Sequence, residues 1–270
     1  MSRDGAGASD LTAEAVSLHL RTQRLGQALV LLEETDSTND EVWRRVQAGA
    51  PPGLVVVARH QTAGRGRQGR SWIDRPDRSL LCSIALRPES ERYWMAGLPL
   101  AAGIAACDAV REISGSPVQL KWPNDLLIEG RKLAGILIEA KSLEGFGRLV
   151  IVGIGMNVGA IEGELPAEVG RRAVSLEAVG GRAVDRSKLL AAILIGFERE
   201  LVRIAADERR AIADRWLERA APLPERVIVR RGKETLEGRP IRLDPLEGIT
   251  IAQENGEIVT VPPPEIELLD

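Results

Sequence analysis

The stretch KLAGILIEAKSLEGFGRLVIVGIGMN, residues 132–157, decides the fold expected for this chain. It holds two apolar runs rich in β-branched residues, Leu133–Ala140 and Leu149–Ile154, separated by the segment SLEGFGR. Two strand-length runs joined by a glycine-containing segment predict a pair of antiparallel strands. Elsewhere strands and helices mix without a regular strand–helix–strand alternation, which favours the α+β class.

Working outward, short apolar runs predict further strands, at Val30–Glu34, Leu54–Ala58, Ser79–Leu86 and Val118–Lys121. Periodic apolar positions predict helices, a short one after the N-cap-type residues Asp36–Asn39, an alanine-rich one over Leu98–Ile113 and a long amphipathic one from Asp185 to about Ala220. We therefore expect a mixed, largely antiparallel sheet with helices packed on it.

The chain is expected to divide near residue 222. Pro222 and Pro224 end the long helical stretch, and short alternating runs with an Asn255-Gly256 hairpin signal follow them. We predict a main catalytic domain over 11–222 and a small all-β domain over 225–270. The polar segment MSRDGAGASD, residues 1–10, is predicted to be a disordered tail.

Composition excludes several classes of protein. Among 270 residues, 36 basic and 39 acidic side chains give a net charge of −3, which argues against a generally basic nucleic-acid binder. The sequence offers no membrane span or signal peptide, so we predict a cytoplasmic protein. Two cysteines and two histidines leave no zinc-ligand spacing, and we predict no metal held by protein ligands alone.

The segment GRGRQGRSW, residues 64–72, matches both G-x-G-x-x-G and a phosphate-binding loop with Arg in place of Lys. Both motifs require a helix to follow, whereas here a proline-containing segment leads into a strand. The remaining interpretation is a flexible loop whose arginines bind an anion with several oxygens. A solvated basic loop and a local nucleic-acid patch, with Trp72 as a stacking platform, stay open as alternatives.

Three further segments are candidates for a site: KWPND at 121–125, at the end of a short strand, GIGMN at 153–157, which follows a strand, and KLAGILIE at 132–139. The last is equally explained as a plain core strand with a glycine where a ligand or side chain needs room. Only five of the 36 basic residues are lysines, and one of them, Lys121, directly precedes a Trp-Pro corner. This rarity favours a specific role for Lys121 over that of an ordinary surface charge. Together with ETDSTND at 34–40 and HQTAGRGRQGRSW at 60–72, these segments resemble the biotin–protein ligase family in order and spacing. The resemblance covers roughly residues 29 to 270.

The resemblance implies a class II synthetase-like catalytic domain followed by a small SH3-like β-barrel. It implies that biotin is activated with ATP and Mg²⁺ to biotinyl-5′-AMP, releasing pyrophosphate, and then transferred to a lysine of a biotin carboxyl carrier domain. A lipoate–protein ligase or octanoyl transferase of the same fold is the alternative, and a dehydrogenase-like nucleotide-binding protein is a more distant one. A homodimer is left open, and no repressor function is expected because the chain lacks the length for an N-terminal DNA-binding domain.

The resemblance also assigns site residues motif by motif. Lys121 and Arg67 are expected to be catalytic. Biotin is expected to contact Ser37, Thr38, Asn39, Gln61, Arg65, Gly66, Arg67, Lys121, Gly135, Ile136 and Leu137. The nucleotide is expected to contact Arg67, Arg70, Trp72, Asn124, Asn157 and Ala173. Ala173 departs from members that place a stacking Trp there, so the adenine pocket must be completed otherwise.

Overall fold

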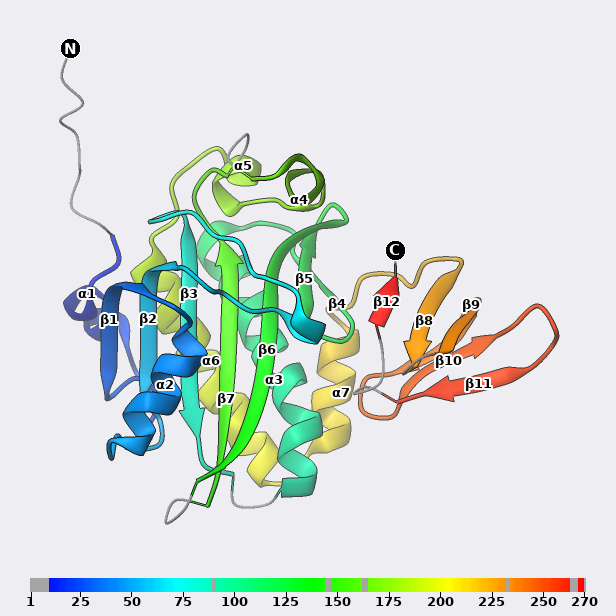
Figure 1. The fold of residues 1–270 in the computed structure, drawn as a ribbon, viewed down its shortest axis with the longest axis horizontal. Coiled ribbons are helices and arrows are strands. Elements are labelled where there is room, and N and C mark those ends of the chain that lie inside the picture. Colours follow the sequence, from blue (N-terminus) through cyan, green and yellow to red (C-terminus); the bar gives the residue numbers. More distant parts are fainter. Residues whose placement is uncertain are drawn as a thin grey trace.

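The computed structural model describes residues 10–88, 91–143, 147–161, 165–231, 234–262 and 267–269. A seven-stranded sheet forms the centre of the molecule, in the order β1-β2-β3-β7-β6-β5-β4 (Figure 1). Its strands are β1 Leu29–Thr35, β2 Val55–Gln61, β3 Ser79–Leu86, β4 Gln119–Lys121, β5 Asp125–Ile128, β6 Arg131–Leu143 and β7 Gly147–Asn157.

The strand pairings confirm the predicted mixed, largely antiparallel sheet. Only β1 and β2 run parallel, and every other neighbouring pair is antiparallel. The pair β6–β7, predicted from residues 132–157, keeps one register from Ala134 opposite Met156 to Leu143 opposite Gly147. The short strand β5 was missed, because four residues between Pro123 and the Glu129-Gly130 turn carry too little pattern.

Helices cover both faces of this sheet, because its strands alternate their apolar side chains between the two faces. Val56 points to the face covered by α2, Thr38–Gln47, whereas Val55 and Val57 point to the main core. That core lies under α3, Glu91–Ser114, and α6, Arg186–Ala205 (Figure 1). The domain also contains four short helical segments, α1 Ala13–His19, α4 Ala167–Arg172, α5 Leu176–Gly180 and the 3₁₀ turn η1 Arg67–Gly69, and a further helix described below.

The prediction of one long helical stretch from Asp185 to about Ala220 missed a break within it. The segment forms two helices, α6 and α7, with α7 spanning Arg209–Leu217. Asp207 lies between them with a φ of +59°, a left-handed conformation that an α-helix cannot contain. The apolar periodicity continues through the break because both helices face the same core.

The C-terminal strands form a separate antiparallel sheet in the order β11-β10-β9-β8-β12. They are β8 Val227–Arg231, β9 Glu234–Asp244, β10 Gly248–Ala252, β11 Ile258–Val261 and β12 Glu267–Leu269. The predicted hairpin at Asn255-Gly256 is confirmed, since it joins β10 to β11 with Gly256 at a φ of +86°. Because β11 and β12 are the outer strands of this order, closure into an SH3-like barrel stays a prediction.

Residues 1–9 of the predicted tail lie outside the described residues. Asp10, the last residue assigned to that tail, instead pairs with Arg186 at 2.6 Å, and this arginine is 4% exposed. Asp10 is therefore bound to the main domain, although the sequence places it in the tail. In the described part of the chain no helix is long and apolar enough to cross a membrane, and the cytoplasmic location stays a prediction.

Candidate functional site

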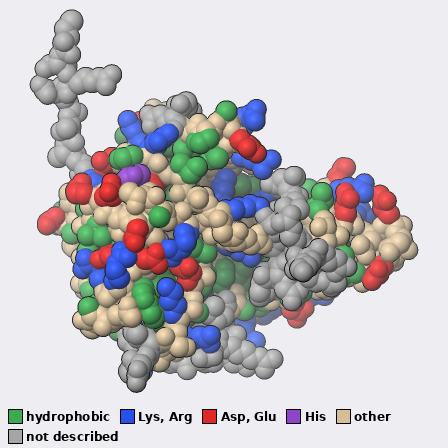
Figure 2. Space-filling view, in the orientation of Figure 1, with side chains coloured by type: hydrophobic (Ala, Val, Ile, Leu, Met, Phe, Trp, Pro, Cys, Tyr) green, Lys and Arg blue, Asp and Glu red, His purple; other side chains and the backbone are tan. Residues whose placement is uncertain are grey.

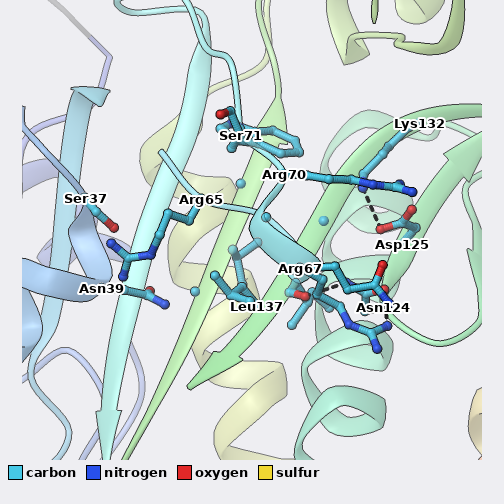
Figure 3. Close-up of a pocket in the computed structure, with 18 of the residues that line it drawn as sticks. Ser37, Asn39, Arg65, Arg67, Arg70, Ser71, Asn124, Asp125, Lys132 and Leu137 are labelled. Carbon is cyan, nitrogen blue, oxygen red and sulfur yellow. Dashed lines mark hydrogen bonds and ion pairs between the residues drawn. The ribbon is translucent and has the colours of Figure 1, made fainter. Parts of the chain in front are cut away.

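A cavity of about 190 Å³ lies on the sheet where β2, β6 and β7 meet the start of α2 and the segment 64–72. Figure 2 shows this face of the molecule, with Lys and Arg side chains in the hollow on the main domain. Segments far apart in the sequence meet here, as the sequence predicted. The cavity has two ends of different chemistry, seen at the left and right of Figure 3.

The first end, which we call the α2 end, consists of Ser37, Thr38, Asn39, Gln61 and Arg65. Gln61 Oε1 accepts hydrogen bonds from the Thr38 backbone N–H at 2.7 Å and from the Thr38 hydroxyl at 3.0 Å. Ser37, Thr38 and Asn39 are each less than 5% exposed. Apart from Arg65, this end therefore presents neutral donors and acceptors, which the start of α2 and β2 hold in place.

Asn39 is held by the strands beneath it. Its Nδ2 donates to Glu139 Oε2 at 2.7 Å, and its Oδ1 accepts from the Ser83 hydroxyl at 2.5 Å. A Cβ added to Gly153 on β7 would lie 2.5 Å from this Oδ1. Glycine is required at 153 because any side chain would displace the amide of Asn39.

Arg65 also belongs to this end, and its charge is compensated. The guanidinium donates to Asp40 through both terminal nitrogens and to Glu139 Oε2 at 3.1 Å. The hydrogen bond to Asp40 raises the pKa of Arg65 against the opposing effect of burial, and Glu139 raises it further. Two carboxylates face one guanidinium, so the cluster has a formal charge of −1.

The second end, which we call the β4 end, is cationic. It consists of Arg67, Arg70, Lys121, Asn124, Asp125 and Lys132. The four cations and the one carboxylate give a formal charge of +3 (Figure 3). Such a surface suits a ligand with several anionic oxygens.

Arg67 is positioned at this end by Asn124. Its Nη1 donates to Asn124 Oδ1 at 3.2 Å, and Asn124 Nδ2 in turn donates to the Ile136 carbonyl at 2.7 Å. Burial lowers the pKa of Arg67, and the nearby charge of Arg70 acts in the same direction while Asp125 opposes it. An arginine remains protonated under such a shift, so the site holds a desolvated cation that an anion would stabilise.

Between the two ends, the floor of the cavity is formed by paired glycines of two neighbouring strands. Gly135 on β6 lies opposite Gly155 on β7, and a Cβ on Gly155 would be only 2.7 Å from Trp72 Cε2. Lys132 Nζ lies 5.9 Å from the centre of the Trp72 ring and 2.7 Å from Asp125 Oδ1. The missing side chains let the indole lie against the sheet.

The segment 64–72 is a looped-out turn and does not open a helix. The turn η1 ends at Gly69, and Arg65 and Ser71 then form an isolated antiparallel bridge. Gln68 and Gly69 have φ angles of +56° and +74°. The dinucleotide and phosphate-loop interpretations therefore lack the helix N-terminus on which both depend.

The structure brings nearly all predicted site residues to this cavity. Those that line it are Ser37, Thr38, Asn39, Gln61, Arg65, Gly66, Arg67, Arg70, Trp72, Lys121, Asn124, Gly135, Ile136 and Leu137. Asn157 and Ala173 are not among the lining residues. Asn157 Nδ2 donates to the Val174 carbonyl at 3.2 Å, and Ala173 forms an isolated bridge with Lys132.

Other lining residues were not predicted as site residues: Gln68, Ser71, Trp122, Pro123, Asp125, Lys132, Gly153, Ile154 and Gly155. Most of them lie inside the sequence motifs quoted above, so their positions in those motifs could have marked them as site residues. Asp125 and Lys132 could have been found by pairing β5 with β6, which places their strands side by side. The alternation Gly153-x-Gly155 places both glycines on the cavity side of one strand.

Known proteins resemble this chain over most of its length. Residues 31–157 match the Biotin/lipoate A/B protein ligase family. The bifunctional ligase/repressor BirA of Bacillus subtilis is 31% identical over 258 residues, which are 96% of this chain and 79% of that protein. The biotin–[acetyl-CoA-carboxylase] ligase of Mycobacterium tuberculosis is 36% identical over 210 residues, covering 70% of this chain and 74% of that protein. The solved biotin protein ligase from Aquifex aeolicus, in complex with biotin and ATP, has a TM-score of 0.77 at 30% identity and covers 90% of this chain and 99% of that one.

Proposed function

The chain belongs to the biotin–protein ligase family, and from this premise we propose that it activates biotin with ATP and transfers it to a lysine of a carrier protein. The observation that carries the proposal is the polarity of one cavity, with hydroxyls and amides beside an arginine already paired with two carboxylates at the α2 end, and a formal charge of +3 at the β4 end. Biotin has a neutral ureido ring at one end and a carboxylate at the other, and so matches that polarity.

At the α2 end, Ser37, Thr38, Asn39 and Gln61 would bind the ureido ring with paired donors and acceptors. Gly135, Ile136 and Leu137 would form the wall along the valeryl chain. This assignment favours biotin over lipoate, whose dithiolane ring has no polar groups to satisfy buried amides and hydroxyls. The relatives and solved structures that resemble the chain also favour biotin, since they are described as biotin ligases.

At the β4 end, an oxygen of the biotin carboxylate would attack the α-phosphorus of ATP. The bond to the β-phosphate oxygen breaks, and pyrophosphate leaves. Lys121 and Arg67 would bind the carboxylate and the α-phosphate while negative charge builds on their oxygens, a contribution of several kcal/mol in a site closed to water. Arg70 would contact the leaving phosphates.

The nucleotide would lie beyond Arg67, bordered by Trp72, Asn124 and the segment that contains Asn157 and Ala173. Mg²⁺ would enter with ATP and would be held mainly by phosphate oxygens and water. The described residues contain no cluster of three or more metal-ligating side chains, and Asp125 can offer one carboxylate from the cavity wall.

In the second step, the neutral amine of the acceptor lysine attacks the acyl carbon of biotinyl-5′-AMP. An amide forms, AMP leaves and a proton is lost to solvent. We propose the biotin carboxyl carrier domain of an acetyl-CoA or related carboxylase as the acceptor. The C-terminal sheet, proposed as an SH3-like barrel, contacts the site directly, because Trp122 Nε1 donates to the Pro245 carbonyl at 3.3 Å.

Pyrophosphate release from Mg-ATP tests this proposal, measured with biotin, lipoate, octanoate or no acid, followed by addition of a biotin carboxyl carrier domain. We expect release with biotin alone and label on the carrier lysine. Release with lipoate or octanoate but not with biotin would assign the protein to the sister branch and contradict the proposal.

A further inference from the structure

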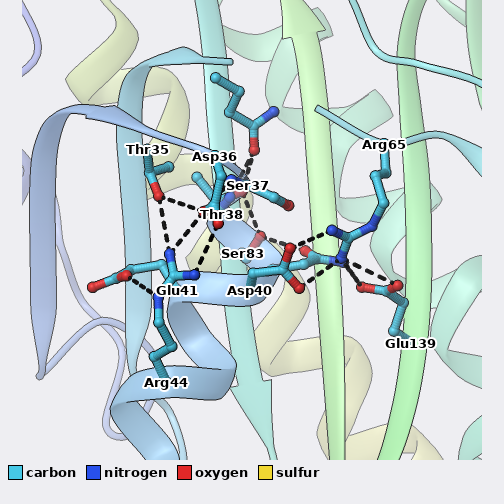
Figure 4. Close-up of polar contacts among 12 residues, drawn as sticks. Thr35, Asp36, Ser37, Thr38, Asp40, Glu41, Arg44, Arg65, Ser83 and Glu139 are labelled. Carbon is cyan, nitrogen blue, oxygen red and sulfur yellow. Dashed lines mark hydrogen bonds and ion pairs between the residues drawn. The ribbon is translucent and has the colours of Figure 1, made fainter. Parts of the chain in front are cut away.

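Arg65 is the first arginine of the segment 64–72, and it contacts two carboxylates from different parts of the domain (Figure 4). Asp40 lies in the first turn of α2, and Glu139 lies within β6. Arg65 Nη2 is 3.0 Å from Asp40 Oδ1 and 3.1 Å from Glu139 Oε2. The three side chains are between 26% and 36% exposed, so water only partly screens the contacts.

The backbone positions of Asp40 and Glu139 are fixed independently of Arg65. Asp40 occupies the third helical position of α2, where the helix dipole stabilises a negative charge. Glu139 projects from the central part of the sheet and also accepts the 2.7 Å hydrogen bond from Asn39. Both carboxylates therefore project from regular elements of the domain, and the side chain of a loop residue binds to them.

Fixing Arg65 also fixes the rest of the turn. The Gly66 N–H donates to the Arg70 carbonyl at 2.7 Å, and the Trp72 N–H donates to the Gly64 carbonyl at 2.9 Å. Arg65 thus lies at the base of a closed turn whose tip carries Arg67. Glycines at 64, 66 and 69 give the segment little stiffness of its own, so its orientation depends on contacts such as these.

We propose that Asp40 and Glu139 are positioning residues that latch the segment 64–72 onto the domain through Arg65 and so present Arg67 at the β4 end. In this account Arg65 serves as an anchor, because its charge is already compensated, and Arg67 serves as the anion-binding arginine. The effect on catalysis rests on the proposed function, whereas the latch itself is a property of the free protein.

Hydrogen exchange of the free protein tests the latch. The double variant Asp40→Asn, Glu139→Gln keeps the shape of both side chains and the acceptor for Asn39 but removes both charges. We expect amides in 62–72 to exchange at least about threefold faster, as the loss of two partly exposed ion pairs implies. Glu41→Gln is the matched control, because Glu41 lies on the same helix and pairs with Arg44 and Arg45.

Arg65→Met is measured beside the double variant, because it removes the contact without touching α2 or β6. A rise confined to 62–72 in Arg65→Met supports the latch. Exchange in 62–72 that matches the wild type in Arg65→Met overturns it, whatever the double variant does.

A kinetic readout separates positioning from general structural support. For Glu139→Gln we expect the KM for biotin to rise about threefold or more, faster escape of biotinyl-5′-AMP, and a kcat for pyrophosphate release within about twofold of the wild type. An unchanged KM with unchanged adenylate escape would contradict the positioning role. If the wild-type protein releases no pyrophosphate with biotin, the proposed function fails, and the exchange comparison still decides the latch.

Discussion

The two ends of the cavity use arginines from the same turn in opposite ways. Arg65, at the α2 end, faces Asp40 and Glu139, and its pKa is raised by these partners. Arg67, two residues later, is bonded to the neutral amide of Asn124, and burial lowers its pKa. Arg65 is bound by two carboxylates and serves to hold structure, whereas the buried guanidinium of Arg67 is placed among other cations, where an anion would stabilise it.

The same contrast extends to the surroundings. The α2 end is built from hydroxyls and amides whose hydrogen bonds are set by the start of a helix and by neighbouring strands. The β4 end gathers four cations around the single carboxylate Asp125. One cavity can therefore bind a neutral ring and a polyphosphate at the same time, with the reacting carboxylate between them.

Loss of the charge of Lys121 at the β4 end should have the largest effect. Lys121→Met is expected to reduce pyrophosphate release with biotin by roughly 100-fold or more, because charge that develops on the phosphate loses a preorganised partner. Lys188→Met, at an exposed position on α6, is the control. Rapid-quench measurement of adenylate formation checks the effect, and near wild-type activity in Lys121→Met would remove this residue from the mechanism.

Exchange of the two arginines for methionine should distinguish the ends. Arg67→Met is expected to raise the KM for ATP and the escape rate of the adenylate by about tenfold, as for loss of a charged hydrogen bond. Arg65→Met is expected to raise the KM for biotin about threefold and the KM for ATP by less than Arg67→Met does, because it loosens the segment that carries Arg67 without removing the charge of Arg67. Steady-state kinetics with each substrate varied in turn checks both, and identical effects of the two variants would abolish the distinction.

The floor glycines should produce smaller effects of the same kind. Gly153→Ala would push Asn39 aside and weaken biotin binding, whereas Gly155→Ala would displace Trp72 and weaken nucleotide binding. Each overpacking is expected to cost about 1–3 kcal/mol of unfolding free energy. Gly180→Ala is the control, because an added Cβ there meets no atom closer than 4.0 Å. Calorimetric titration with biotin and with ATP checks both variants. Weaker ATP binding in Gly153→Ala together with weaker biotin binding in Gly155→Ala would refute the assignment.

The smallest effect is expected from treatment of the two buried cysteines with a thiol reagent. Burial raises the pKa of Cys82 to about 12 and that of Cys107 to about 11. Both thiols therefore stay protonated at pH 8 and should resist iodoacetamide in the folded protein. Mass spectrometry before and after treatment checks this, and fast labelling with loss of activity would place a thiol in the site.

Much of this arrangement could be predicted from the sequence because its motifs are local. The residues Ser37 to Asn39, Arg67 and Lys121 lie within short segments whose order and spacing resemble the biotin–protein ligase family, and this resemblance implied a common site. The antiparallel pair β6–β7 followed from its apolar pattern. The break at Asp207 did not, because apolar periodicity persists through it and a single left-handed residue leaves no trace in the pattern.

What the sequence did not predict are pairings that depend on three-dimensional register. Nothing local to Arg65 indicates that Asp40 and Glu139, which are 25 and 74 residues away, neutralise it. The ion pair of Asp125 with Lys132 likewise depends on the strand pairing of β5 with β6. Charge compensation, which separates an anchoring arginine from a binding one, is therefore visible only in the folded chain.

The structure of the complex with biotinyl-5′-AMP tests the central claim most directly. We predict the ureido ring among Ser37, Thr38 and Gln61, and the phosphate within hydrogen-bond distance of Arg67 and Lys121, with Arg65 still bound to Asp40 and Glu139. A phosphate bound by Arg65, with its carboxylate contacts broken, would contradict the division of roles between the two ends.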